Sequence, residues 1–293
     1  MSVIHFVGVG KMGLPMALHL KAAGHAVTVS DPSEERLQLA RQQGLPLVQD
    51  AQAAMGHADV VFSSLPNDAA LRSVAAQVGR AARRGATYVD TSTVSQQVSA
   101  EAAEVLAAAG VLYLRTTVSG NNKMAEAAQL TVMASGPRAA YDTVLPLLKT
   151  LGPNQFYLGE AEQARLMKLV VNLMIAQTSA MLAEGLTLGR KGGLDWHDMW
   201  QVLGASAVAS PILKAKAVQL SERDFTPTFT VGQMIKDLDL ILGAGAAVHA
   251  PLAQTALTHQ LMHAALAQGE GHEDYAAIIK TVERSAGLST EME

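Results

Sequence analysis

Three glycines near the start of the chain, Gly8, Gly10 and Gly13, have the spacing G-x-G-x-x-G. They follow an apolar, β-branched run at residues 2–9 and open an alanine- and leucine-rich stretch at residues 11–23. Between a strand and a helix, such glycines permit a tight turn, let the backbone approach a pyrophosphate, and allow close helix–strand packing. The unpaired N–H groups of the helix N-terminus also attract phosphate. The spacing alone fits an ordinary turn as well, but this context predicts a dinucleotide-binding βαβ unit.

A carboxylate stands where the second strand of such a unit would end. Residues 25–30 predict this strand, and Asp31 follows Gly13 by 18 positions. An acidic residue about 20 positions after the glycines hydrogen-bonds the ribose hydroxyls of the cofactor and repels a 2′-phosphate. The nearest basic residue, Arg36, lies inside the next predicted helix. We therefore expect NAD, with NADP as the second option; the alternative is that Asp31 caps the following helix, a role also open to Ser33.

The first half of the chain alternates β-branched runs with alanine-rich stretches, which is the pattern of a parallel sheet covered by helices. Further strands are predicted at residues 60–64, 87–90, 113–117, 130–134 and 155–158. Further helices are predicted at residues 34–43, 68–79 and 101–109. The predicted fold class is therefore α/β, with a Rossmann-type doubly wound parallel sheet.

Residues 162–191 form a long stretch without proline that is apolar nearly all round. A helix of this length and pattern is expected to be buried between domains or by another subunit. Strand signals vanish beyond it, and helices are predicted at residues 196–205, 211–220, 231–246 and 251–268. The sequence thus predicts a dinucleotide-binding domain at 1–160, an interdomain helix at 161–191, and an all-helical C-terminal domain for substrate binding and oligomerisation at 192–293.

The composition excludes several classes of partner and site. The 293 residues carry a formal net charge of −4, which is a poor balance for binding nucleic acid. The chain has no cysteine, so disulfides, thiolate metal sites and cysteine nucleophiles are excluded, and no metal site is predicted. No apolar run of about 18 residues and no leader segment stand out, so no membrane span is expected. These features are typical of a soluble cytoplasmic protein.

Five short motifs follow one another along the chain. The glycine element extends over residues 8–17 as GVGKMGLPMA, followed by DTST at 90–93 and TVSG at 117–120. KLVVN stands at residues 168–172, and IKDL at 235–238. Together they resemble the signatures of the β-hydroxyacid dehydrogenases, the family that contains 3-hydroxyisobutyrate dehydrogenase and tartronate semialdehyde reductase. The corresponding family motifs are the nicotinamide-side D-x-S-T, the substrate-binding P-V-S-G-G, the catalytic K-x-x-N-N and the late K-D-L.

The resemblance implies an NAD-dependent oxidoreductase that transfers a hydride between nicotinamide and a small β-hydroxy acid or semialdehyde. The long apolar stretch at residues 162–191 separately predicts a homodimer or tetramer. Lys168 would be the general acid or base of this reaction. The substrate-binding residues would be Ser119, Gly120, Asn121 and Asn172. The cofactor-binding residues, from the glycine element and the resemblance together, would be Gly8, Gly10, Lys11, Met12, Gly13, Asp31, Leu65, Pro66, Thr93 and Lys236.

The residues around Lys168 agree with the implied role. Lys168 and Asn172 are four positions apart, so they lie on one face of a helix and can point at one substrate. Their neighbours within residues 166–174 are apolar, and burial among them is expected to lower the pKa of the lysine toward that of a useful proton donor or acceptor. The alternative is a structural lysine whose stem runs along a buried helix to the surface.

The chain departs from the family pattern around the substrate motif and before the lysine. Asn121 replaces the second glycine of P-V-S-G-G, and RTT at residues 115–117 replaces D-A-P. Glu162 and Ala164 replace glycines, and Val171 replaces the first asparagine of K-x-x-N-N. Because asparagine adds a donor and an acceptor where bare backbone is usual, the acid group of the substrate or its α substituent is expected to differ from that of common hydroxy acids.

Two other functions remain open from the sequence. One is an imine reductase on the same scaffold, in which another residue replaces the lysine. The other is a dinucleotide-binding protein without catalytic activity. The lysine at position 168 argues against the first, and Lys168, Ser119 and Lys236 together argue against the second.

Overall fold

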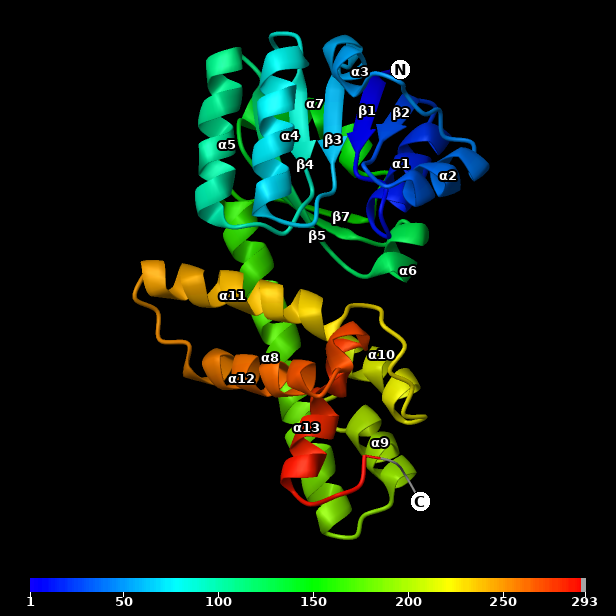
Figure 1. The fold of residues 1–293 in the computed structure, drawn as a ribbon, viewed down its shortest axis with the longest axis vertical. Helices are drawn as coiled ribbons and strands as arrows, with labels where there is room; N and C mark the ends of the chain where they lie inside the picture. The colour runs from blue at the N-terminus through cyan, green and yellow to red at the C-terminus, as the bar shows by residue number, and fades with distance from the viewer. Residues whose placement is uncertain (291–293) are drawn as a thin grey trace. The chain divides into compact units, whose positions relative to one another are not determined.

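The computed structural model describes residues 1–290, and the chain divides into two compact units, Met1–Lys168 and Leu169–Glu293. The first unit is built around a seven-stranded sheet (Figure 1). Its strands are β1 Val3–Val7, β2 Ala26–Ser30, β3 Val60–Ser63, β4 Thr87–Asp90, β5 Leu112–Ser119, β6 Thr131–Ser135 and β7 Asn154–Tyr157. Its helices are α1 Gly13–Ala22, α2 Glu34–Gln42, α3 Ala51–His57, α4 Asp68–Ala81, α5 Gln96–Ala109, α6 Asn122–Glu126 and α7 Arg138–Leu148.

The strand order β2-β1-β3-β4-β5-β6-β7 reverses direction between β1 and β3. In open α/β sheets, ligands bind outside the carboxyl ends of the strands at such a point. All neighbouring strands are parallel except β5 and β6, where Arg115 pairs with Ser135 in an antiparallel ladder. The predicted parallel sheet thus includes one antiparallel pair. Residues 120–130 are too short to carry a parallel crossover, which needs about a dozen residues or more and usually a full helix.

Apolar side chains fill both faces of the sheet because successive residues of a strand point to opposite sides. Phe6 packs with residues of α1, α2 and α7, including Met16 and Leu148. The next residue, Val7, packs on the other face with residues of α3, α4 and α5. Buried on both sides, the strands read as continuous apolar runs, as the sequence pattern suggested. The Rossmann-like fold predicted for this part of the chain is confirmed.

The described residues of the second unit form helices joined by loops, with one isolated β-bridge between Thr230 and Asp274. The long helix α8, Gln163–Lys191, begins in the first unit and continues into the second. It is followed by α9 Trp196–Ala205, α10 Pro211–Leu220, α11 Val231–Ala247, α12 Ala253–Ala267 and α13 Ile278–Ser285, with short 3-10 turns at Glu270–His272 and Tyr275–Ala277. Leu182 and Leu186 of α8 share a core with Trp200 of α9 and Met262 of α12. The predicted C-terminal domain ends in residues 291–293, which lie outside the described residues.

Four helices were not predicted: α3, α6, α7 and α13. The first two span only 7 and 5 residues, which is too short for a clear helical period. Helix α7 contains Pro146, a residue that usually ends a helical pattern. Helix α13 is short and follows a 3-10 turn. Its N-cap residue is Ala277, which has no capping side chain, so the sequence gives no signal for the start of the helix.

Helix α8 corrects one expectation about membranes. Its 29 residues are long and apolar enough to cross a bilayer by length and composition, and 39% of its most apolar window is buried in the structure. The expectation that no such run exists is therefore wrong for this helix. A core helix of a globular protein meets the same criteria, so this property by itself is weak support for a membrane span.

A histidine buried in the sheet makes the stability of the fold dependent on pH. His5 is fully buried, with Nδ1 3.0 Å from Thr28 Oγ1 and Nε2 2.9 Å from Ser30 Oγ. Burial lowers the pKa of His5 from 6.5 to about 4, so the unfolded chain binds more protons than the folded chain between these values. We expect the free energy of unfolding to fall by up to about 1.4 kcal/mol per pH unit from this group as the pH drops from 6.5 toward 4.

This pH dependence can be measured by urea unfolding at pH 7, 6 and 5. His5→Gln, which places no titrating group at this position, should have a shallower dependence on pH than the wild-type protein. His197→Gln, at an exposed position on α9, is the matched control and should keep the wild-type slope. Equal slopes for the wild-type and His5→Gln proteins would contradict a neutral, buried His5.

Candidate functional site

The glycine loop between β1 and α1 lies at the reversal point of the sheet. Gly8 has φ +88°, and a Cβ there would lie 2.4 Å from the carbonyl oxygen of Ser64. A Cβ on Gly13 would lie 1.9 Å from the carbonyl oxygen of Gly8. A Cβ on Gly10, in contrast, would meet no atom within 4 Å among the described residues. The protein itself thus requires glycine at the two outer positions, while the middle position leaves room for a ligand to approach the backbone.

The loop and the start of α1 offer features that suit a phosphate. The N-cap residue of α1, Met12, makes no side-chain capping bond within the described chain, so no side chain serves the first N–H groups of this helix. A cavity of about 450 Å³ lies beside the loop and is bordered by Gly10 and by the cations Lys11 and Arg36. Glu126 lines the same cavity, but two cations and a helix N-terminus outweigh its single negative charge and favour an anion such as a pyrophosphate.

Replacing Gly10 with alanine should separate binding from folding. The added Cβ would occupy the space left for a phosphate, so we expect NAD affinity to fall about tenfold or more with little change in melting temperature. Gly13→Ala should instead lower the melting temperature, because its Cβ would clash with the backbone of Gly8. Gly204→Ala, on α9 and also in open space, is the control for affinity. Unchanged NAD binding by Gly10→Ala in isothermal titration calorimetry would contradict the assignment of this loop.

Asp31 is held in place by two backbone donors. Its Oδ2 accepts from Val9 N at 2.8 Å, and its Oδ1 accepts from Ser33 N at 2.8 Å. The residue that caps α2 is Ser33, whose Oγ accepts from Arg36 N at 3.4 Å. Asp31 therefore joins the glycine loop to the turn after β2 and is not the helix cap. Each carboxylate oxygen retains a lone pair that a ribose hydroxyl can use.

The DTST motif at residues 90–93 is mostly structural. Asp90 is fully buried, and its Oδ1 accepts from the hydroxyls of Ser63 and Ser92. Ser92 Oγ in turn accepts from Leu65 N at 2.8 Å. The motif thereby fixes the loop after β3 that contains Leu65 and Pro66 beside the loop after β4 that contains Thr93. The structure brings these three predicted cofactor residues onto neighbouring loops, while Asp90 faces the interior.

A buried arginine that sequence reasoning missed completes this network. The side chains of Arg165 and Asp90 are both fully buried and form an ion pair between Nη2 and Oδ2. Arg165 also donates to the carbonyl oxygen of Ser92 at 2.6 Å, to Ser99 Oγ at 3.1 Å and to the Tyr113 hydroxyl at 2.8 Å. Burial raises the pKa of Tyr113, so its hydroxyl stays neutral. The first turn of α8 is thus tied to the end of β4.

The position of this arginine matters because it stands three residues before Lys168. The only sequence signal was a cation in the first turn of an otherwise apolar helix, together with an aspartate at the end of a buried strand. Neither signal identifies the other as its partner. A lysine one turn along α8 is thereby held relative to the loops of Leu65 and Thr93 by a buried guanidinium that makes four hydrogen bonds.

The departures from the family pattern pair with one another. The Nε of Arg115 donates to Glu162 Oε1 at 2.8 Å, and its guanidinium lies 4.6 Å from the centre of the Tyr113 ring. Thr117 Oγ1 donates to the carbonyl oxygen of Ala164 at 3.0 Å. The side chains of Arg115 in β5 and Glu162 before α8 therefore match, whereas Thr117 uses a backbone carbonyl that any residue at position 164 would supply. Both contacts join this strand to the start of the helix and act inside the first unit.

Asn121 has a local structural role. Its Oδ1 accepts from Met124 N at 3.0 Å, which caps the short helix α6. The preceding Gly120 has φ +138°, and a Cβ there would lie 2.7 Å from Leu130. Glycine is required at the first of these positions, whereas asparagine serves at the second as a helix cap. The cap gives Asn121 a structural reason to replace glycine. The cap uses only the amide oxygen of Asn121, so its NH₂ group and the half-buried Ser119 stand near the end of β5 as candidate substrate contacts.

Lys168 and Asn172 lie one turn apart on α8. Lys168 is half-buried, while Leu166 and Met167, two of the apolar neighbours expected to enclose it, are themselves exposed. In the second unit, the buried Asn172 donates through Nδ2 to Asp237 Oδ2. The Lys236 ammonium lies 2.9 Å from Asp237 Oδ1, a close charge contact. Asp237, absent from the predicted site residues, thus links two residues that were among them.

Models of two protein families match successive parts of the chain. Residues 3–159 match the NAD binding domain of 6-phosphogluconate dehydrogenase. Residues 163–282 match the family described as the NAD-binding of NADP-dependent 3-hydroxyisobutyrate dehydrogenase. Together with the sheet, these matches define an NAD(P)-binding oxidoreductase with a helical C-terminal part.

Two relatives illustrate the range of similar proteins. The 2-(hydroxymethyl)glutarate dehydrogenase of Eubacterium barkeri is 34% identical over 290 residues, covering 98% of this chain and 96% of that protein. The cytokine-like nuclear factor N-PAC of Homo sapiens is 29% identical over 280 residues, covering 94% of this chain. This chain spans only 51% of N-PAC. The chain belongs to the β-hydroxyacid dehydrogenase family, in the group like 3-hydroxyisobutyrate dehydrogenase.

Solved structures agree with this assignment. The Mycobacterium tuberculosis 3-hydroxyisobutyrate dehydrogenase with L-serine has a TM-score of 0.86 at 28% identity, covering 96% of this chain and 99% of that one. An imine reductase from Pseudomonas sp. has a TM-score of 0.64 at 24% identity, covering 95% and 98% of the two chains. The second likeness concerns the fold alone.

Proposed function

We propose that this protein is an NAD-dependent dehydrogenase or reductase of small β-hydroxy acids and their semialdehydes, with Lys168 as the general acid or base. The observation that carries the proposal is the position of Lys168. It follows Arg165 by one helical turn, and Arg165 is tied to the loop that leads to Thr93. A proton-transferring group must be held within hydrogen-bond reach of the reacting oxygen, and such an anchored turn supports that requirement.

The nicotinamide, when bound, supplies the hydride acceptor or donor of the reaction. In oxidation, Lys168 Nζ accepts the proton of the substrate hydroxyl; in reduction, it donates a proton to the carbonyl oxygen as that oxygen becomes a hydroxyl. Ser119 and the backbone N–H of Gly120 hold the substrate carboxylate. Asn172, whose amide is oriented by the bond from Nδ2 to Asp237, positions the substrate through its amide oxygen or its second N–H. The charge balance requires a lysine that is neutral before oxidation and protonated before reduction.

The names of the relatives narrow the substrate class. The compounds 3-hydroxyisobutyrate, 2-(hydroxymethyl)glutarate and L-serine share one skeleton, in which a primary alcohol is attached to the carbon next to a carboxylate. We propose substrates of the form HOCH₂–CHR–COO⁻ and the corresponding semialdehydes for this protein as well. In this proposal, Ser119 and Gly120 bind the carboxylate and Lys168 hydrogen-bonds the hydroxyl. The side group R is then the part of the substrate that differs among family members.

The cofactor choice rests on Asp31. Its carboxylate is fixed by the N–H groups of Val9 and Ser33, and a 2′-phosphate beside it would meet like charge. Arg36 lines the cavity next to Gly10 and is the cation that would support NADP instead. We propose NAD as the preferred cofactor because the carboxylate is fixed at the ribose position, whereas Arg36 lies in the first turn of α2, beyond Asp31.

The proposal can be tested by a turnover screen with C3 to C6 hydroxy acids and semialdehydes, using NAD and NADP in both directions. We expect turnover with one or more compounds of the HOCH₂–CHR–COO⁻ form and a lower KM for NAD than for NADP. Reduction of cyclic imines without oxidation of any hydroxy acid would favour an imine reductase. Dinucleotide binding without turnover of any compound would favour a non-catalytic protein. A lower KM for NADP would contradict the role of Asp31.

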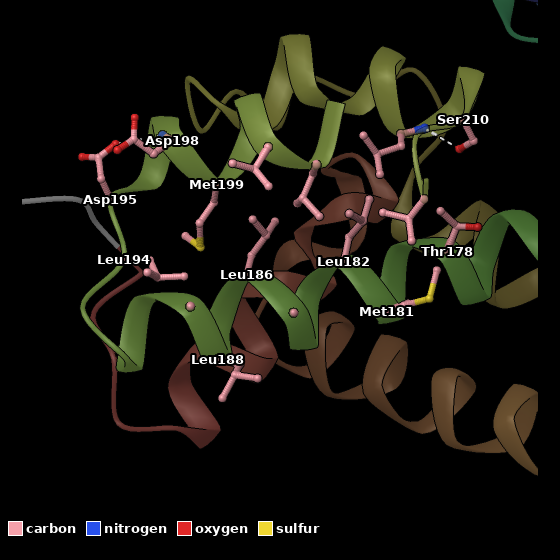
Figure 2. Close-up of a pocket in the computed structure, with 16 residues that line it drawn as sticks. Thr178, Met181, Leu182, Leu186, Leu188, Leu194, Asp195, Asp198, Met199 and Ser210 are labelled. Carbon is pink, nitrogen blue, oxygen red and sulfur yellow. Dashed lines mark hydrogen bonds between the residues drawn. The ribbon is translucent and has the colours of Figure 1, made fainter. Parts of the chain in front are cut away.

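We further propose that the protein is a cytoplasmic homo-oligomer in which α8 packs against a second copy. Met174, Met181 and Leu188 are spaced seven residues apart on α8 and are 64%, 62% and 74% exposed. Residues at this spacing lie on one side of a helix, as in the seam between packed helices. Part of this stripe borders an apolar groove of about 810 Å³ between α8 and α9, shown in Figure 2. Contiguous exposed apolar surface of this kind is typical of protein interfaces.

A charge placed in the stripe should dissociate the oligomer. We expect the wild-type protein to sediment as a dimer or tetramer, and Met181→Glu to sediment as a smaller species at the same concentration, because burying an unpaired carboxylate is costly. Val218→Glu, at an exposed valine of α10, is the matched control and should leave the assembly intact. A wild-type monomer at all concentrations would exclude the proposed interface.

A further inference from the structure

A cluster of three metal-ligating side chains lies in the second unit, among residues that the proposed reaction does not use. His259 and His263 are four positions apart on α12, and Asp239 is on α11, which packs against α12. Asp239 Oδ1 is 2.8 Å from His259 Nε2, and the Nε2 atoms of the two histidines are 3.1 Å apart. One potential ligand atom from each of the three residues lies within 4.8 Å of the other two.

Hydrogen bonding within the protein does not account for all of these contacts. His259 Nε2 carries either one proton or one lone pair, yet it faces both the Asp239 carboxylate and His263 Nε2. If this nitrogen donates to the carboxylate, it has no second proton for His263. If it is the acceptor from His263, its lone pair faces the lone pairs of the carboxylate. A cation between the three atoms would use one lone pair from each of them.

We propose that Asp239, His259 and His263 form a binding site for a divalent transition metal, with Zn²⁺ as the best match. Two imidazoles and one carboxylate are ligands that Zn²⁺ accepts, at about 2.0–2.2 Å in tetrahedral geometry. The edge of such a tetrahedron is about 3.3 Å, so the ligand atoms need to separate by only a few tenths of an ångström at the two short contacts. Two histidines at i and i+4 lie on one helix face, which suits chelation by adjacent turns.

The site has three protein ligands and is open to solvent. Asp239 and His263 are exposed, and only His259 is half-buried. A fourth position therefore remains for water, and the metal can exchange. Bound metal would clamp α11 to α12 at a point two residues after Asp237, the residue that contacts Asn172 and Lys236. Its role is structural: it steadies the helix that carries Lys236, and it takes no part in the transfer of hydride or proton.

The site can be tested on the full chain, prepared without a histidine tag and stripped with a chelator. Isothermal titration with Zn²⁺ should show one site per chain, and saturating Zn²⁺ should raise the melting temperature. His259→Ala, His263→Ala and Asp239→Asn should each weaken Zn²⁺ binding by tenfold or more and abolish most of the melting shift. Because these readouts need neither substrate nor dinucleotide, their result is independent of the proposed catalytic function.

Controls make each outcome decisive. His197→Ala, at an exposed histidine of α9, should bind Zn²⁺ as the wild-type protein does. Cobalt substitution gives a second readout, since three protein ligands and a water should produce the absorption bands of tetrahedral Co²⁺ in the wild-type and His197→Ala proteins but not in the three ligand variants. The proposal is overturned if Zn²⁺ binds equally well to the wild-type protein and the His259→Ala, His263→Ala double variant. It is also overturned if Zn²⁺ leaves the melting temperature unchanged.

Discussion

Lys168→Ala is expected to lower kcat on the best hydroxy acid by about 10²- to 10⁴-fold, because that is the usual effect of losing a positioned acid or base. The effect should be near the upper end, since the variant also loses a positive charge beside the developing alkoxide. NAD affinity should change little, because Lys168 is not among the groups proposed to hold the cofactor, and the phosphates and ribose are assigned to the glycine loop and Asp31. Steady-state kinetics together with calorimetric NAD binding would measure both quantities.

Two further variants distinguish proton transfer from electrostatics. Lys168→Arg keeps the positive charge but cannot give up its proton near neutral pH, so it should be nearly as inactive as the alanine variant. Lys191→Ala removes an exposed lysine from the last turn of the same helix and should retain full activity. If Lys168→Arg is active, the lysine acts as an electrostatic anchor only. If Lys168→Ala changes melting temperature but keeps kcat within a few-fold, the lysine is structural.

Arg165→Met should destabilise the first unit by about 3–5 kcal/mol, because it leaves the fully buried Asp90 carboxylate without its cation. The hydroxyl of Tyr113 and the carbonyl oxygen of Ser92 would lose donors in the same substitution. The free energy of unfolding in urea is the direct measurement. Combining Arg165→Met with Asp90→Asn should recover part of the loss, because the buried charge is then absent.

An exposed ion pair provides the comparison for this prediction. Arg72 and Glu101 form an ion pair at 2.8 Å, with side chains 52% and 42% exposed. Solvent screens such a pair, so Arg72→Met should change stability far less than Arg165→Met does. If the two substitutions lower the free energy of unfolding by similar amounts, the buried hydrogen bonds and ion pair of Arg165 contribute little to stability. In that case Arg165 would not be the group that fixes the turn before Lys168.

Features that depend on residues close together in the sequence could be predicted from the sequence alone. The glycine loop was located correctly, because the spacing of Gly8, Gly10 and Gly13 reflects a turn formed by six consecutive residues. The bounds of α9 and α10 match those predicted, since Asp195 and Ser210 cap these helices locally. The order of the two parts of the chain, a sheet followed by helices, also follows from local hydrophobic periods. Roles for Lys168, Ser119 and Asn172 came from the family resemblance and stay predictions.

Features that join distant segments were decided by the tertiary structure. The antiparallel pairing of β5 and β6 depends on where the strands end: β5 extends to Ser119, whereas the predicted bounds left about a dozen residues, enough for a parallel crossover. Arg165 and Asp90 are 75 positions apart, and Arg115 and Glu162 are 47 apart. Asp239 meets His259 only because α11 and α12 pack together. A charged residue is recognisable in a sequence, but its partner is selected by the packing that excludes water around both, so these pairs became visible only in the folded chain.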